Sequence, residues 1–222
     1  MSAQAKSPAE ADRRPIAARS WRVSQIAADW LVRHGVSANG VSVAGMIAGL
    51  AAGTALAATA HLDGLPQRLA WLAAAALIVT RLLANMLDGM VAIGSRTSSA
   101  VGELYNEVPD RVSDSAALVG LGYAAGGEPV LGVVAALAAV FTAYVRALGK
   151  GAGAGQEFIG PFAKQQRMAC VIGCAVYCGL ATADWLPAPG LPAIVLAVVA
   201  IGSLFTALRR VRRISLRLRG AR

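Results

Sequence analysis

Charged side chains are scarce in this 222-residue chain: Asp, Glu, Lys and Arg make up 15% of it, where globular proteins have about 25%. Hydrophobic residues make up 56%, which is more than a chain of this length could bury in one water-facing core. The same composition excludes intrinsic disorder, because disordered chains are polar and highly charged. A membrane protein is the class that remains.

Acidic residues are the rarer of the few charges, with 12 Asp and Glu against 21 Lys and Arg and a formal net charge of +9. Such an excess is compatible with three partners: nucleic acid, an anionic membrane surface or a phosphate-bearing substrate. The positions of the charges are needed to choose among them.

Long uncharged runs predict six membrane-spanning helices. A spanning helix needs roughly 20 mostly apolar residues, and runs that are continuous rather than alternating favour helices over a barrel. The predicted spans cover residues 39–60, 68–93, 101–125, 129–149, 165–183 and 190–208. We therefore expect an all-α integral membrane protein with a six-helix domain over residues 35–208.

Basic residues gather on one side of these predicted spans. They occupy the N-terminal arm, the tail at 209–222 and the loops that hold Arg96, Arg146, Lys150, Lys164 and Arg167, whereas the opposite side has Arg68 alone. The positive-inside rule then places both termini in the cytoplasm of a bacterial-type inner or cell membrane. The tail is expected to contact anionic lipids. Nucleic acid is the disfavoured alternative, because no soluble recognition domain accompanies the tail.

The N-terminal segment is predicted to lie outside the spans. Residues 1–17 are expected to be a disordered basic arm, and they are not a signal peptide because no apolar core follows the first basic residues. Residues 18–34 mix basic and polar side chains with apolar ones, namely Trp21, Ile26, Trp30 and Leu31. This pattern predicts an amphipathic helix in the cytoplasmic interface, with a short soluble helix as the alternative.

Two residue types recur every four positions. Gly45, Gly49 and Gly53 in the first span predict a helix face that another helix approaches closely, within the molecule rather than in a dimer. Three cysteines in the fifth span, Cys170, Cys174 and Cys178, also share a face. They imply no disulfide framework. Packing of small apolar side chains is favoured for them over a soft-metal site.

Polar residues gather where the second span ends and the third begins. They are Arg81, Asn85 and Asp88, followed by Glu103, Asn106, Glu107, Asp110, Arg111 and Asp114. Ionisable groups at membrane depth cost a few kcal/mol each, and by default they mark a functional site. At about 100° per residue Asn85 and Asp88 share a face, and the acids and Asn106 of the third span fall within an arc of about 100°. Two polar stripes are therefore predicted to face each other across the turn at 94–100.

Oxygen ligands without His or Cys suit a hard cation such as Mg²⁺, which leaves room for phosphate oxygens. Cationic groups on the same side could hold further phosphate: Arg96, Arg111, Lys164 and Arg167. For Lys164 and Arg167, anchoring at the cytoplasmic face is an equal alternative. A metal- and phosphate-binding cleft open to the cytoplasm is the favoured interpretation. The alternative is an internal ion-pair network that holds the two helices together.

The segment 85–110, NMLDGMVAIGSRTSSAVGELYNEVPD, resembles the signature of the CDP-alcohol phosphotransferase family, Asp-x2-Asp-Gly-x2-Ala-Arg-x8-Gly-x3-Asp-x3-Asp. These are membrane enzymes of phospholipid synthesis. The spacing is kept without insertion or deletion, and five positions match in type: Asp88, Gly89, Ala92, Gly102 and Asp110. Asn85 and Asn106 replace the first and third Asp, and Ile93 replaces the Arg. The family's six-helix topology agrees with the predicted spans.

The resemblance implies a site of known chemistry. Asp88 would bind Mg²⁺ or Mn²⁺, one or two ions, and Asp110 would be both a ligand and the base that acts on the incoming alcohol. Asn85 and Asn106 would complete a weakened coordination shell. The nucleotide pocket would be shaped by Gly89, Ala92 and Gly102. The implied reaction transfers a substituted phosphate, phosphatidyl from CDP-diacylglycerol, to a small alcohol and releases CMP. Relatives of this kind are usually homodimers.

The departures from the signature lead to further hypotheses. Two carboxylates balance one divalent ion rather than two, and Glu107, as well as Glu103, could restore some charge. Arg96 could replace the cation that is missing at Ile93. A catalytically impaired relative, which binds nucleotide or lipid headgroup or regulates a synthase, is the alternative function. A transporter is disfavoured because the acids cluster at one membrane face and no inverted repeat is present.

Overall fold

The computed structural model describes residues 21–95, 100–181 and 190–220, and all regular structure in these ranges is helical. The helices, in chain order, are α2 (Arg22–Arg33), α3 (Ala38–Ala58), the short 3₁₀ helix η2 (Thr59–His61), α4 (Gly64–Gly94), α5 (Ala100–Gly122), α6 (Pro129–Gly151), α7 (Lys164–Leu180) and α8 (Leu191–Gly220). The predicted all-α architecture is confirmed.

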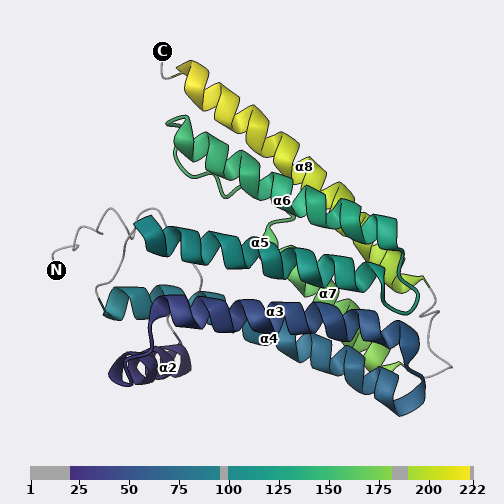
Figure 1. Cartoon of the computed structure of the whole chain (residues 1–222). Coiled ribbons are helices and arrows are strands. Elements are labelled where there is room, and N and C mark those ends of the chain that lie inside the picture. Colours follow the sequence, from purple (N-terminus) through teal and green to yellow (C-terminus); the bar gives the residue numbers. More distant parts are fainter. Residues whose placement is uncertain (1–20, 96–99, 182–189, 221–222) are drawn as a thin grey trace.

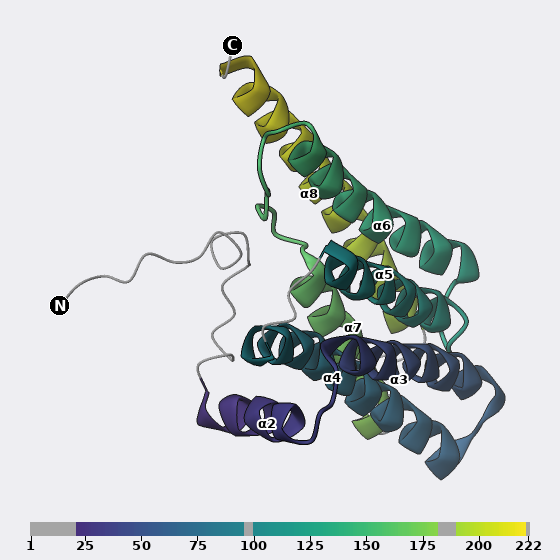
Figure 2. The ribbon, with the colours of Figure 1, turned by 60° about the vertical axis from the view of Figure 1, so that its left-hand side comes forward.

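The helices form two groups that share α5 (Figures 1 and 2). In the first, α3 packs extensively against both α4 and α5, and α7 covers α4. In the second, α6 packs against α8 and against α5. The short helix α2 lies against α4 at the left-hand end of the bundle in Figure 1, and α8 ends on that same side. The described chain therefore begins and ends at the same end of the bundle.

Glycines on α3 allow its close approach to α4 and α5. A Cβ atom at Gly45 would lie 2.7 Å from the Cβ of Ala84, and one at Gly49 would lie 2.5 Å from the Cβ of Ser113. A Cβ atom at Gly53 would overlap the carbonyl oxygen of Ala116. The predicted close-packing face is thus confirmed, and its partners are helices of the same chain.

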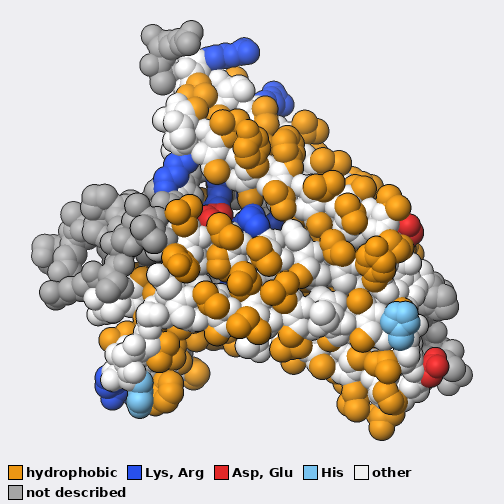
Figure 3. All heavy atoms as spheres, viewed as in Figure 1, with side chains coloured by type: hydrophobic (Ala, Val, Ile, Leu, Met, Phe, Trp, Pro, Cys, Tyr) orange, Lys and Arg blue, Asp and Glu red, His pale blue; other side chains and the backbone are white. Residues whose placement is uncertain are grey.

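Four described helices are long and apolar enough to cross a membrane: α3 with η2 (Ala38–His61), α4, α6 and α8. The predicted third and fifth spans correspond to α5 and α7, which do not meet that criterion. The reason is composition for α5, whose sequence includes Glu107, Asp110, Arg111 and Asp114, and length for α7, which has 17 residues. The outer faces of the bundle carry many large apolar side chains (Figure 3), as lipid-facing helices do.

Two segments differ in extent from the sequence-based prediction. The segment 18–34, expected to form an interfacial helix, contains the helix α2, and residues 1–20, including the predicted arm, lie outside the described residues. The sixth span was expected to end at 208, whereas α8 continues through the basic tail to Gly220. Packing explains the continuation: the buried Arg210 donates to the carbonyls of Thr142 and Ile159 at 2.8 and 2.9 Å, and Arg217 pairs with the buried Glu157 at 3.0 Å.

Candidate functional site

The polar stripes of α4 and α5 face each other inside the bundle. On α4, Arg81, Asn85 and Asp88 are separated by four and three residues and therefore share a face. Arg81 and Asp88 each expose 3% of their surface, and Asp110 on α5 exposes 7%. Charges buried this deeply need partners, because burial without them costs several kcal/mol.

Asp110 is the point at which three helices meet. Its Oδ1 atom accepts a hydrogen bond from Asn85 Nδ2 of α4 at 2.6 Å and one from Lys164 Nζ of α7 at 2.5 Å. Arg81 Nη2 of α4 donates to the same oxygen. The Oδ2 atom lies 3.5 Å from Arg111 Nη2, beyond hydrogen-bond range. One carboxylate oxygen is therefore saturated with donors, and the other is much less engaged.

Asp88 is bound quite differently. Its Oδ2 accepts a hydrogen bond of 2.6 Å from Ser42 Oγ on α3. Its Oδ1 atom is buried and has no hydrogen-bond partner among the described residues. A buried carboxylate oxygen without a donor is uncommon and calls for an explanation such as a bound ion. The Asp88 side chain is therefore held in place through Oδ2, and its Oδ1 is left to bind a ligand.

A second acid on α5 joins two cations of α7. Asp114 lies 3.6 Å from both Lys164 Nζ and Arg167 Nη2. Arg167 is itself buried, and its Nη1 donates to the carbonyl of Phe162 at 2.9 Å and to Thr142 Oγ1 at 3.3 Å. The two α7 residues predicted to hold phosphate are thus brought next to the acidic stripe of α5.

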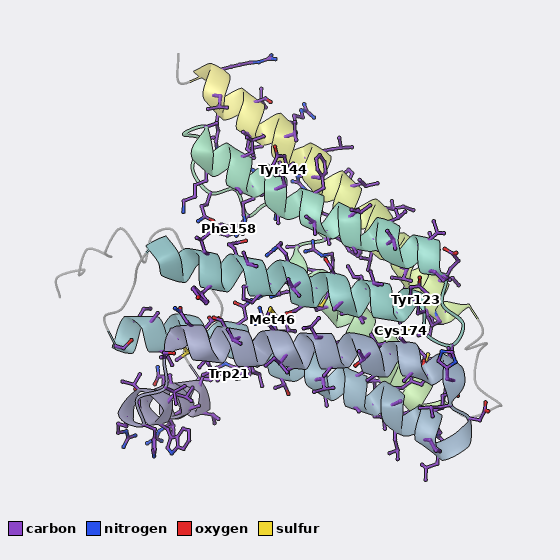
Figure 4. All side chains as sticks on the ribbon, in the orientation of Figure 1. Trp21, Met46, Tyr123, Tyr144, Phe158 and Cys174 are labelled. Atoms are coloured by element: carbon purple, nitrogen blue, oxygen red, sulfur yellow. The ribbon has the colours of Figure 1, made fainter. Side chains whose placement is uncertain are left out.

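Glu107 is engaged at the edge of this cluster. Its carboxylate pairs with Arg146 of α6 and lies 3.5 Å from Arg111 Nη2 on its own helix. The Arg146 guanidinium also lies 5.6 Å from the ring centroid of Phe158, which is seen between α5 and α6 in Figure 4. In Figure 3 acidic and basic side chains lie in a hollow between these two helices, surrounded by apolar ones. Glu107 thus links α5 to α6.

A Glu107→Gln variant tests whether Glu107 also binds the metal ion, besides linking α5 to α6. The Glu107 side chain is 41% exposed, so we expect the free energy of unfolding to fall by at most about 1 kcal/mol. Mn²⁺ affinity is expected to stay unchanged, since the carboxylate pairs with Arg146 and lies near Arg111. Thermal unfolding and Mn²⁺ titration in detergent measure both, with Asp63→Asn at the other end of α4 as the control. A loss of Mn²⁺ affinity in this variant would mean that Glu107 is a metal ligand.

The other predicted site residues occupy the same part of α4 and α5. Gly89, Ala92, Gly102 and Asn106 are all half-buried. Ile93, at the position of the family's arginine, is 51% exposed. Arg96 lies outside the described residues, as does the side chain of Glu103. The spacing of the signature is thus carried by two adjacent helices whose matching acids, Asp88 and Asp110, are both buried.

The donor set fits one divalent ion better than two. Within the described ranges, no group of three or more His, Cys, Asp or Glu side chains is arranged to hold a metal. Asp88 Oδ1 is a buried acceptor that lacks a donor, and the Asn85 amide oxygen, one turn earlier, is a further ligand of the type that hard cations accept. Asp110 Oδ1 already receives three donors. The residues therefore fit a single ion at Asp88.

Several contributors to the site were not assigned from the sequence. The sequence marks Arg81 as a charge within a span and as a possible ion-pair partner, and its position one turn before Asn85 is the signal for a role in the site. Ser42, which binds Asp88, stands in an uncharged run of α3 and gives no sequence signal. The same holds for Thr142 on α6, which accepts from Arg167. These contacts join residues far apart in sequence and follow from the helix packing alone.

Comparison with known proteins gives the fold a precedent. No family model matches the chain. The Escherichia coli K12 inner membrane protein YnbA is 26% identical over 190 residues, which cover 84% of this chain and 88% of that protein. The Mycobacterium tuberculosis phosphatidylinositol phosphate synthase PgsA1, solved with CDP-DAG bound, superposes with a TM-score of 0.72 at 20% identity over 87% of this chain and 94% of that one. The same synthase in complex with manganese and citrate gives 0.71 at 20% identity, over 86% and 88%. The chain therefore has the fold of this synthase, as the resemblance of segment 85–110 predicts.

Proposed function

We propose that this chain is a membrane phosphotransferase of phospholipid biosynthesis, related to the CDP-alcohol phosphotransferases. It transfers phosphatidyl from CDP-diacylglycerol to a small alcohol and releases CMP. The observation that carries the proposal is the burial of Asp88 and Asp110, the two matching acids of the signature, on facing stretches of α4 and α5. The fold in which they lie is shared with a synthase solved with CDP-DAG bound.

Asp110 is proposed as the catalytic base. Its Oδ1 is anchored by Asn85, Lys164 and Arg81, and this fixes the direction of Oδ2, the oxygen left to accept a proton. In the reaction the acceptor hydroxyl gives its proton to Oδ2, and its oxygen bonds to the phosphorus of the phosphatidyl group. The bond from that phosphorus to the CMP oxygen breaks, and CMP leaves with the electron pair.

The donor pyrophosphate would lie between the acids and the α7 cations. Asp88, with the amide oxygens of Asn85 and Asn106, would hold one Mg²⁺ or Mn²⁺. Such an ion, when bound, neutralises charge on phosphoryl oxygens and orients the leaving group. Lys164 and Arg167 would add charge-assisted hydrogen bonds to phosphate. The small residues Gly89, Ala92 and Gly102 would let the nucleotide approach the helix backbones.

The proposed topology has six spans with both termini and the site in the cytoplasm. A 17-residue helix such as α7 is about 26 Å long, close to the roughly 30 Å of the hydrocarbon core. α5 would cross as well, with its charges turned inward onto α4, α6 and α7. Helix α2 would lie in the interface, since Val23, Ile26 and Trp30 are exposed. The exposed Arg209, Arg212 and Arg219 of α8 would contact anionic lipid.

The assay for the proposed activity is CMP release by the purified full-length protein in detergent. CDP-diacylglycerol, Mn²⁺ and a panel of alcohols, among them glycerol phosphate, inositol phosphate and serine, are supplied together. We expect CMP to form with one acceptor class and to require that acceptor. CMP release with none of the acceptors contradicts the proposed transferase.

Two observations favour a second candidate, a non-catalytic relative that binds a CDP-linked lipid. Asp110 Oδ1 is held by three donors, and Asn replaces Asp at positions 85 and 106; all of these lower the basicity and charge of the site. Retained binding of CDP-diacylglycerol with no CMP release from any acceptor would support this candidate over the enzyme.

A further inference from the structure

Arg81 is a buried cation far inside an apolar helix. It lies 13 residues before Gly94, the last residue of α4, which corresponds to about 20 Å along the axis. Only 3% of its surface is exposed. Intramembrane arginines are costly and are kept where they serve a site or a partner.

The three nitrogens of its guanidinium face three different surroundings. Nη2 pairs with Asp110 Oδ1, and Nε donates to Ser113 Oγ at 3.0 Å, both on α5. Nη1 is buried without a hydrogen-bond partner among the described residues. It packs against α3, where a Cβ atom at Gly45 would come within 2.9 Å of it. The absence of a side chain at Gly45 thus leaves the room that the guanidinium occupies beside Asp110.

Charge balance explains why a cation is fixed there. A signature with four Asp carries four negative charges, which two divalent ions neutralise. Asn85 and Asn106 reduce these to the charges of Asp88 and Asp110. Together with the neighbouring Asp114, these acids are already balanced by Arg81, Lys164 and Arg167. Two divalent ions would then add four positive charges to a buried cluster, about twice what the two phosphates of a bound donor would neutralise, which is unfavourable. One ion, next to Asp88 Oδ1, adds charge that the phosphates of a bound donor would neutralise.

We propose that Arg81 takes the place of a second divalent ion at Asp110, so that this chain binds one ion where a four-Asp site binds two. The inference rests on the site of the proposed function. Arg81 is a positioning residue in it, because the guanidinium holds Asp110 Oδ1 and orients the opposite oxygen. The two missing carboxylates at positions 85 and 106 and the buried Arg81 are thus explained together: the guanidinium supplies the positive charge that a second ion would have supplied.

The test is the number of Mn²⁺ ions bound per chain, measured from the free Mn²⁺ signal in electron paramagnetic resonance with the purified protein in detergent. We expect about one ion for the wild type. The triple variant Asn85→Asp, Asn106→Asp, Arg81→Gln should bind about two. The double variant that keeps Arg81 should bind its second ion at least about tenfold more weakly than the triple variant, because the guanidinium still holds Asp110.

Two variants control for folding and for charge in general. Arg81→Lys retains the cation and should keep the wild-type number of bound ions. Arg68→Gln removes another arginine of α4, which donates to the carbonyls of Gly179 and Leu180, and should also keep the wild-type number. A wild-type count of zero or two overturns the inference whether or not the triple variant folds. Equal second-ion affinity in the double and triple variants also overturns it. Two ions with CMP release would refute the role of Arg81 alone, whereas one ion with no CMP release would refute the proposed reaction alone.

Discussion

Asp110→Asn is expected to lower the rate of CMP release by at least about a hundredfold, the lower end of the contribution of general base catalysis. The amide retains an acceptor oxygen for Asn85 and Lys164 but can no longer accept a proton. The matching assay is CMP release under saturating CDP-diacylglycerol and acceptor, so that the loss is read in kcat. Binding of CDP-diacylglycerol, measured separately, is expected to persist.

The same substitution removes the partner of the buried Arg81, and breaking a buried ion pair can cost about 3–5 kcal/mol of stability. Asp110→Glu separates the two effects, because it keeps the negative charge for Arg81 and Lys164 while moving the carboxylate by one methylene. We expect this variant to unfold near the wild-type temperature and still to lose most of its CMP release. Asp63→Asn, at the exposed far end of α4, should match the wild type in both measurements. Full activity in a folded Asp110 variant would rule out its role as the base.

Much of the fold follows from patterns that act locally along the chain. Apolar runs, together with the polar stripes of α4 and α5, locate the six long helices of the bundle to within a few residues, except that α8 is longer. The Gly45, Gly49, Gly53 repeat identifies the close-packing face of α3, since a missing Cβ has the same consequence whatever helix approaches. The signature at 85–110 places both matching acids on helices that prove to be adjacent. In each case the information lies within one helix or two consecutive helices.

The remaining features depend on contacts between distant segments. The bond from Ser42 to Asp88 depends on how α3 crosses α4, and the pairing of Arg146 with Glu107 depends on how α6 lies along α5. Hydropathy could not give the helical continuation after 208, because Arg210 is stabilised by carbonyls of α6 and of the α6–α7 connection. The hydrogen bonds of Asp110 likewise depend on packing: its donors come from α4 and α7, and they could be assigned only once the helix arrangement was known.

Gly53→Val is expected to destabilise the protein more than any surface substitution, by about 3 kcal/mol or more. An added Cβ would overlap the carbonyl oxygen of Ala116 and lie 3.2 Å from its side chain. Backbone cannot yield as the end of a flexible side chain can, so α3 and α5 would have to separate. A Cβ at Gly120 would in turn overlap the Gly53 backbone, which makes Gly120→Val a second test of the same crossing. Thermal unfolding in a single detergent gives the comparison.

Gly173→Ala on α7 is the matched control, because a Cβ there meets nothing within 4 Å. This variant should be neutral or more stable by up to about 1 kcal/mol, since alanine favours the helix. The difference between Gly53→Val and Gly173→Ala should appear in Mn²⁺ binding as well as in stability. Separation of α3 from α5 would shift α5, which carries Asp110 and the proposed ligand Asn106, relative to α3 and α4. The folded fraction of Gly53→Val should therefore bind Mn²⁺ at least about tenfold more weakly. Equal unfolding temperatures for Gly53→Val and Gly173→Ala would mean that the α3–α5 contact does not hold the site together.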